Sequence, residues 1–211
     1  PDNPSGHFMP RGDVLRLADW CKDRKIKLAV DESFVDFTDA GIDNSLLHND
    51  ILEANPYLYV VKSISKSYGV PGLRLGIIAS SDTDFICKVK KEASIWNINS
   101  FAEFYMQISG KYEKDYLAAC EKFREERDIF YKELSGISYL RVIPSQANYF
   151  MCEVSGMTSA DLTQRLIEHD VLISNCGLKH KMEGRQFIRL SIRSREDNAM
   201  LISILKSIKP E

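Results

Sequence analysis

Residues 57–76 read YLYVVKSISKSYGVPGLRLG, and this stretch decides the fold. It opens with the apolar run 57–61, which is typical of a strand buried inside a sheet. A polar segment with glycines and a proline follows, and these residue types mark a loop. A second apolar run, 75–79 (LGIIA), begins at the end of the stretch. A buried strand that leads into a polar loop is typical of a sheet edge at which ligands bind.

A similar pattern precedes this stretch. The short run 27–30 (KLAV) indicates another buried strand, which ends in Asp31-Glu32-Ser33. Apolar residues at helical spacing predict a helix over about 11–25, and helical patterns also lie between the two strands. This alternation predicts an α/β domain with a mainly parallel sheet. We expect a binding site where the first two strands end, because ligands bind at the carboxyl ends of such strands.

The pattern changes from about residue 101. One face of a long charged helix is marked by Tyr116, Cys120, Phe123, Phe130 and Leu134, and Gly136 ends this helix. The elements expected after it are a strand near 139–154, a helix near 158–168, strands near 171–175 and 186–193, and a closing helix near 195–208. They predict a small α+β domain. With the boundary inside the long helix, the two predicted domains are residues 1–120 and 121–211.

The composition argues against several classes of protein. The chain has 211 residues, with 28 Lys and Arg against 30 Asp and Glu, so we expect no nucleic-acid partner held mainly through phosphates. No stretch approaches the roughly 18 consecutive apolar residues of a membrane span, and no signal peptide opens the chain. Five cysteines and four histidines are scattered, which predicts reduced thiols, a cytoplasmic location and no metal site.

Lys66 is the first candidate for chemistry. It follows a strand end and is flanked by hydroxyl groups and glycines, so it can face a ligand. Desolvation there would lower the pKa of the amine, and a neutral amine can form a Schiff base with a carbonyl. Ser63 and Ser65 could hydrogen-bond a phosphate, which the planar guanidinium of Arg74 could also bind. The alternative interpretation is a surface lysine in a polar loop.

Asp31 and Asn3 are further candidates. Asp31 follows a buried strand, and a buried carboxylate requires a charged or hydrogen-bonding partner, such as a protonated ring nitrogen. Helix capping is the alternative role for Asp31. Asn3 precedes Pro4-Ser5-Gly6, and its side chain could donate to a phenolate oxygen. Taken alone, the Asn3 segment is equally typical of a plain turn.

Together, these residues resemble a known family. Residues 3–6 (NPSG), residues 30–34 (VDESF), residues 63–66 (SISK) with 72–76 (GLRLG), and residues 187–191 (FIRLS) occur in the order seen in class I/II aminotransferases, which are fold-type I pyridoxal-phosphate enzymes. The resemblance covers essentially the whole chain. It implies a three-layer, mainly parallel α/β sheet that forms part of the large cofactor-binding domain, followed by the small α+β domain.

The resemblance also implies the cofactor and the role of each residue. Lys66 would hold pyridoxal 5'-phosphate as a Schiff base and then move the proton at the substrate's Cα. Asp31 would pair with the ring nitrogen, and Asn3 would bond the phenolic oxygen. Arg189 would bind the carboxylate of a small amino-acid substrate. The cofactor phosphate would be held by Ser63, Ser65 and Arg74.

Within the family, the chain resembles the histidinol-phosphate aminotransferase group and threonine-phosphate decarboxylase most. We expect an aminotransferase that acts on an amino acid or an amino-acid-derived phosphate ester. The alternatives are an α-decarboxylase of the threonine-phosphate type and a non-catalytic regulatory domain. Phe34 stands where most aminotransferases have a tyrosine, and the decarboxylase also tends to have Phe at this position. Ser174 stands where both groups have an arginine, which weakens the inference of a substrate phosphate.

The resemblance makes two further predictions about partners. Family members have a segment before the Asn-Pro turn that contributes a phosphate loop and an aromatic ring, and this sequence starts inside the turn. We therefore expect a preceding segment of the same protein to complete the site, and the isolated chain to be inactive. Because family members are usually dimers with the partner near the cofactor, a homodimer is also implied.

Overall fold

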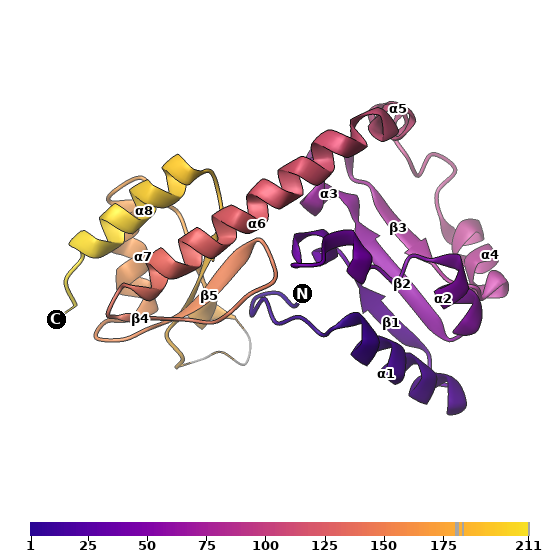
Figure 1. Cartoon of the computed structure of the whole chain (residues 1–211), viewed down its shortest axis with the longest axis horizontal. Helices are drawn as coiled ribbons and strands as arrows, with labels where there is room; N and C mark the ends of the chain where they lie inside the picture. Colours follow the sequence, from indigo (N-terminus) through magenta and orange to yellow (C-terminus); the bar gives the residue numbers. More distant parts are fainter. Residues whose placement is uncertain (180–181, 183, 211) are drawn as a thin grey trace. The chain divides into compact units, whose positions relative to one another are not determined.

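The computed structural model describes residues 1–179, 182 and 184–210. The chain divides into two compact units, one formed by Met9–Cys120 and the other by Pro1–Phe8 together with Glu121–Glu211 (Figure 1). The sequence analysis placed residues 1–8 with the first unit. They pack with the second because the Tyr149 hydroxyl donates to the Asp2 carbonyl at 2.8 Å and the Gln146 amide donates to the Gly6 carbonyl at 3.0 Å.

The unit Met9–Cys120 contains a three-stranded sheet of order β1-β2-β3 (Figure 1). Its strands are β1 (Leu28–Asp31), β2 (Leu58–Ser63) and β3 (Gly76–Ala79). β1 and β2 are parallel, as predicted, whereas β2 and β3 are antiparallel. The reason is the short connection between β2 and β3, since parallel neighbours need a crossover of about a dozen residues or more, usually with a full helix. Its α-helices are α1 (Arg11–Asp23), α2 (Asn49–Ala54), α3 (Ile64–Ser67), α4 (Thr83–Glu92) and α5 (Ser100–Ser109).

The core of this unit explains why the apolar runs form strands. Leu58 and Val60 on β2 are buried together with Leu46 and Ile51, and residues of α1 and β1 pack against this cluster. Burying side chains of this size removes apolar surface from water, which is the main stabilising contribution to the sheet. The segments between the elements include the 3₁₀ helices Val35–Phe37, Gly41–Asn44, Pro71–Leu73 and Gly110–Tyr112.

The second unit contains an antiparallel sheet of order β4-β5-β7-β6. Its core includes Phe130, Phe150, Leu162 and Ile188, all of them buried. Its strands and helices are β4 (Leu140–Val142), β5 (Tyr149–Val154), α7 (Ser159–Ile167), β6 (Ser174–Asn175), β7 (Phe187–Ser191), α8 (Arg195–Ser207) and the 3₁₀ helix Cys176–Leu178. The long helix α6 (Glu113–Ser135) contributes residues to both units and ends just before Gly136, as expected.

Two strand predictions in this unit need correction. The strand expected over 139–154 is two strands, because Pro144 has no backbone N–H to donate in a ladder and the chain turns between β4 and β5. The strand expected near 171–175 is limited to Ser174–Asn175. Among the described residues, no helix is both long enough and apolar enough to cross a membrane.

Gly6 is essential to the way residues 1–8 join the second unit. Its φ of +73° is a left-handed conformation that favours glycine. A Cβ added at Gly6 would lie 1.9 Å from the Oγ atom of buried Ser145, which is far too close. The backbone of Gly6 therefore packs directly on Ser145.

We predict that Gly6→Ala lowers the free energy of unfolding by about 3 kcal/mol, since it adds a clash to the cost of a left-handed alanine. Equilibrium denaturation measures this change. Gly69→Ala is the matched control, because Gly69 also has a positive φ of 64° but a Cβ there would meet nothing within 4 Å. The control should lose only about 1–2 kcal/mol. Equal losses would show that the contact with Ser145 has no effect.

Candidate functional site

The ends of β1 and β2 are joined by backbone pairing. Asp31 is the last residue of β1 and lies opposite Val61 on β2. The amide of Glu32 donates to the Val61 carbonyl at 2.8 Å, and the amide of Ser63 donates to the Ser33 hydroxyl at 2.9 Å. The chain that follows Asp31 is therefore held against the chain that leads to Lys66.

Lys66 lies in the short helix α3, immediately after β2. Ser63 is half-buried, Ser65 is buried and the Lys66 side chain is exposed. The desolvation of Lys66 that the sequence analysis expected is therefore not provided by the described residues. What they do provide is an accessible primary amine at a strand end.

Arg74 lies just before β3, at the end of the 3₁₀ helix Pro71–Leu73. Its φ of 56° and ψ of 44° are left-handed, and its guanidinium donates to the Pro71 carbonyl at 3.2 Å. The next residues pair with the Lys66 segment, since the Ile64 amide donates to the Leu75 carbonyl at 3.1 Å and Gly76 lies opposite Ser63. β3 is antiparallel to β2, so its beginning lies at the same end of the sheet as the ends of β1 and β2.

The donor set at this sheet end fits the cofactor that the resemblance implies. Asp31, Lys66 and Arg74 are all exposed there, and they supply a carboxylate, an amine and a guanidinium. These groups match a protonated ring nitrogen, an aldehyde and a phosphate respectively. The strand pairings bring all three to one edge.

Arg189 and Asn3 lie in the other unit and contact each other. The Arg189 guanidinium donates to Asn3 Oδ1 at 2.7 Å, and its carbon lies 4.9 Å from the centre of the Tyr149 ring. A cation over the face of an aromatic ring is attracted by the ring's quadrupole. The Nε atom of Arg189 is buried and has no hydrogen-bond partner among the described residues. Arg189 is thus fixed in place and retains a donor for a ligand.

Arg189 also lines a hollow of about 440 Å³ in this unit. Ser174, which lies opposite Arg189 across the β6–β7 pair, lines the same hollow. The other lining residues are Val171, Leu172, Ile173, Leu190, Ser191, Arg193 and Leu201. Arg193 binds Asp197 at 2.9 Å, and Arg195 binds Glu126 at 3.0 Å. These two arginines are therefore paired within the unit.

The predicted site residues therefore fall into two groups. The structure brings Asp31, Lys66, Arg74 and the two serines to one end of the first unit's sheet. It brings Asn3 and Arg189 together in the second unit. That both groups serve one site stays a prediction, which rests on the order of the motifs.

The sequence analysis missed a buried ion pair next to this site. Lys62 Nζ lies 2.7 Å from Asp36 Oδ1, and the two side chains are only 5% and 2% exposed. Tyr116, which was assigned to a helix face, donates its hydroxyl to Asp36 Oδ2 at 2.7 Å. Burial raises the pKa of Tyr116, so its hydroxyl stays protonated as a donor. A lysine within an otherwise apolar strand was the one signal available in the sequence.

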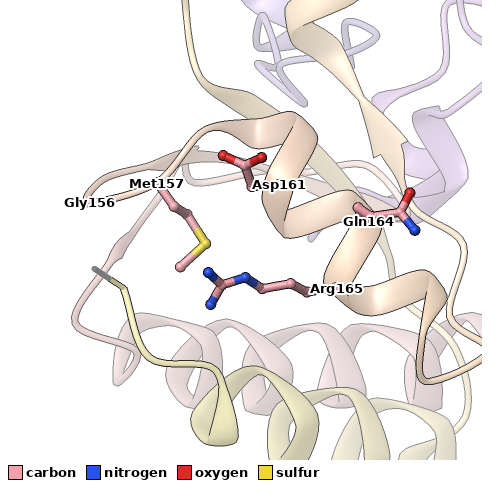
Figure 2. A pocket seen from close by; sticks show the side chains of 5 residues that line it. All are labelled: Gly156, Met157, Asp161, Gln164 and Arg165. Carbon is pink, nitrogen blue, oxygen red and sulfur yellow. The ribbon is translucent and has the colours of Figure 1, made fainter.

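A further hollow, of about 370 Å³, lies beside α7 (Figure 2). It is lined by Gly156, Met157, Asp161, Gln164 and Arg165. Asp161 accepts from the Thr158 hydroxyl at 2.6 Å as part of the helix cap, and Arg165 donates to the Lys209 carbonyl at 3.0 Å. Its two charged side chains thus hold the helix cap and the C-terminal segment, and none of the predicted site residues lines it.

The Asn3–Arg189 contact gives a prediction that does not depend on any ligand. Asn3→Ala removes the acceptor of a charged donor, so we expect a loss of about 1 kcal/mol in the free energy of unfolding. Asn3→Asp keeps an acceptor of the same shape and adds a negative charge, so its stability should equal or exceed that of the wild type. Chemical denaturation compares the three proteins. An Asp variant as unstable as the Ala variant would contradict the contact.

Comparison with known proteins gives consistent matches. The family profile described as aminotransferase class I and II matches residues 1–205. CMP-5'-(3-aminopropyl)phosphonate synthase from Streptomyces rubellomurinus is 31% identical over 99% of this chain and 33% of its own length. Threonine-phosphate decarboxylase from Salmonella typhimurium is 31% identical over 99% of this chain and 56% of its own length.

A solved structure agrees with these matches. A decarboxylase from Sulfurospirillum multivorans aligns with a TM-score of 0.86 and 27% identity, covering 98% of this chain and 59% of that chain. The α/β class predicted from the sequence is thereby confirmed. The chain spans between about a third and a little over half of the length of the two curated relatives.

Proposed function

The chain belongs to the aminotransferase class I and II family, and on this premise we propose that it forms the lysine-bearing part of a pyridoxal-phosphate-dependent aminotransferase. The observation that carries the proposal is the convergence of Asp31, Lys66 and Arg74 at one end of a sheet. The family depends on pyridoxal 5'-phosphate. The donor set at that sheet end is chemically matched to this cofactor.

Each residue has a definite task in this proposal. The bound cofactor supplies an electron sink for negative charge that develops at the substrate's Cα. Asp31 keeps a proton on the ring nitrogen through charge attraction. Arg74 binds the phosphate with Ser63 and Ser65, since guanidinium and hydroxyl groups are both donors to phosphate oxygens. Lys66 binds the aldehyde carbon through its amine.

The second unit binds the substrate in this proposal. The Nε atom of Arg189 has no hydrogen-bond partner among the described residues, and an arginine side chain can bind a carboxylate with two parallel hydrogen bonds. Asn3 Oδ1 is already occupied by Arg189, which leaves the Asn3 amide nitrogen to donate to the phenolic oxygen of the cofactor. Lys66 would act as the general base and acid of the reaction, because its amine can take the proton from the substrate's Cα and give it back.

Decarboxylation of an amino-acid phosphate ester is the second candidate. The 31% identity to threonine-phosphate decarboxylase and the likeness to a solved decarboxylase support it. Ser174, beside Arg189, argues against a phosphate group on the substrate, because a serine hydroxyl adds no positive charge to that part of the hollow. Both candidates use the same Lys66, Asp31 and Arg189.

The proposal extends to assembly. We propose a homodimer in the cytoplasm whose site is completed by further chain of the same protein. Ile95, Trp96 and Phe101 are 90%, 89% and 79% exposed, and large exposed apolar side chains of this kind commonly mark contact surfaces. Size-exclusion chromatography with light scattering tests the dimer.

We predict that Lys66→Ala abolishes the visible absorbance of the protein-bound cofactor, because Lys66 supplies the exposed amine at this sheet end. Lys66→Arg is the matched control for charge, and it should lose the absorbance as well. Borohydride reduction followed by peptide mass mapping should find the cofactor on Lys66 in the wild type. Attachment to another lysine, or absorbance that survives in Lys66→Ala, would disprove the assignment.

The two candidate reactions are separated by one paired assay. Purified protein with cofactor is incubated with amino acids and their phosphate esters, with and without a keto-acid acceptor. The proposal predicts amino transfer that requires the keto acid and little carbon dioxide release. Carbon dioxide release without a keto acid would establish the decarboxylase instead.

Arg189→Lys should raise KM for the reacting substrate about tenfold or more, because Lys cannot bind a carboxylate with two parallel bonds.

A further inference from the structure

Asp36 is a buried carboxylate to which two separate elements donate. It lies in the 3₁₀ helix Val35–Phe37, shortly after Asp31, and is 2% exposed. Lys62 Nζ is 2.7 Å from its Oδ1 atom, and the Tyr116 hydroxyl is 2.7 Å from its Oδ2 atom. Both oxygens of this carboxylate are therefore bonded to groups from the same unit, one on β2 and one on α6.

These two donors hold the Lys66 segment on both sides. Lys62 lies just before this segment, on the strand that leads into α3. On the other side, Tyr68 caps α3 and its ring stacks on the Tyr116 ring, with centres 4.1 Å apart and planes 5° apart. The contacts thus form a closed ring, in which the chain on each side of Lys66 is connected to Asp36.

The ring also includes the chain after Asp31. β1 is paired with β2 through Asp31 and Val61, and the residues after β1 are bonded to β2 up to Ser63. Asp36 follows directly on this paired segment, so it is connected by a short stretch of chain to Asp31. One carboxylate therefore links the chain that carries the predicted ring-nitrogen partner to the chain that carries the predicted Schiff-base amine.

Stability alone does not account for this arrangement. A buried ion pair adds little net stability over well-packed apolar side chains, because both charges lose their hydration. Its directional bonds fix geometry, however, and two bonds on one carboxylate define the position of both donors. The Lys62–Asp36 pair lies next to the Lys66 segment, in which a small displacement would move the Lys66 amine relative to the Asp31 carboxylate.

We propose that Asp36 is a positioning residue, which with Lys62 and the stacked pair Tyr116 and Tyr68 fixes the Lys66 amine relative to the Asp31 carboxylate. This inference rests on the proposed function of Lys66 and Asp31. Asp36 itself does not touch cofactor or substrate in this proposal. It acts through the two segments that it joins.

The test compares Asp36→Asn and Tyr116→Phe with the control Tyr112→Phe in the protein with bound cofactor. Asp36→Asn leaves Lys62 buried without a charged partner and can fail to fold. Tyr116→Phe keeps the stacked ring and removes only the donor to Asp36. Tyr112 lies on the same part of the chain, but it is 57% exposed, and the described donors to the Asp36 carboxylate are Lys62 and Tyr116.

Two readouts are measured in addition to kcat and KM. The first is the pH titration of the absorbance of the Lys66-linked cofactor without substrate, which reports the placement of the amine against Asp31. In Tyr116→Phe and in Asp36→Asn, the midpoint of this titration should shift by about one pH unit, which is equivalent to a tenfold change in the proton equilibrium. In the same two variants, kcat should fall about tenfold while KM stays nearly unchanged. The second is hydrogen exchange of amides 63–68 in the cofactor-free protein, which should become faster in the same two variants. Tyr112→Phe should match the wild type in both.

The outcomes separate this inference from the proposed function. A wild-type protein without Lys66-linked absorbance would refute the proposed function, and the role of Asp36 would fall with it. Normal absorbance in the wild type with an unchanged titration midpoint in Tyr116→Phe would refute the positioning role alone. Variants that lose thermal stability but keep the wild-type titration and kcat would show that the ring of contacts is only structural.

Discussion

The parallel pairing of β1 with β2 is the constraint on which the rest of the first unit depends. It runs from Leu28 opposite Leu58 to Asp31 opposite Val61. A slip of one residue would turn every side chain to the other face of the sheet, so that Lys62 would face away from Asp36 and Leu58 would leave the core. The apolar side chains that fix this register also determine where the carboxylate and the amine emerge.

The exposed Asp31 of the site is followed in the sequence by buried polar groups. Glu32 is 4% exposed, and its carboxylate accepts from the Ser45 hydroxyl at 2.8 Å and from the Leu46 amide. Asp36 is buried in the same segment and accepts from Lys62 and Tyr116. Asp31, the last residue of β1, is exposed. One exposed carboxylate that is available to a ligand is thus followed along the chain by two buried carboxylates that hold the structure.

The sequence predicted the strands well wherever an apolar run was continuous. The runs 27–30 and 57–61 became β1 and β2 because burial of such side chains dominates local structure. The direction of β3 and the break at Pro144 were not predicted, since both depend on connection length and on pairing partners. The contacts of Asp36 with Lys62 and Tyr116 were not predicted for a related reason. Their partners are 26 and 80 residues apart, and no local pattern encodes such a pair.

The attachment of residues 1–8 to the later unit has a consequence for biosynthesis. Asp2 bonds Tyr149 across 147 residues of chain, and Asn3 bonds Arg189 across 186. A ribosome releases the early segment long before it makes its binding partners. The segment must therefore remain without these two contacts until translation has passed β7. Non-local closure of this kind slows folding, so the attachment of residues 1–8 is a late event in the folding of the second unit.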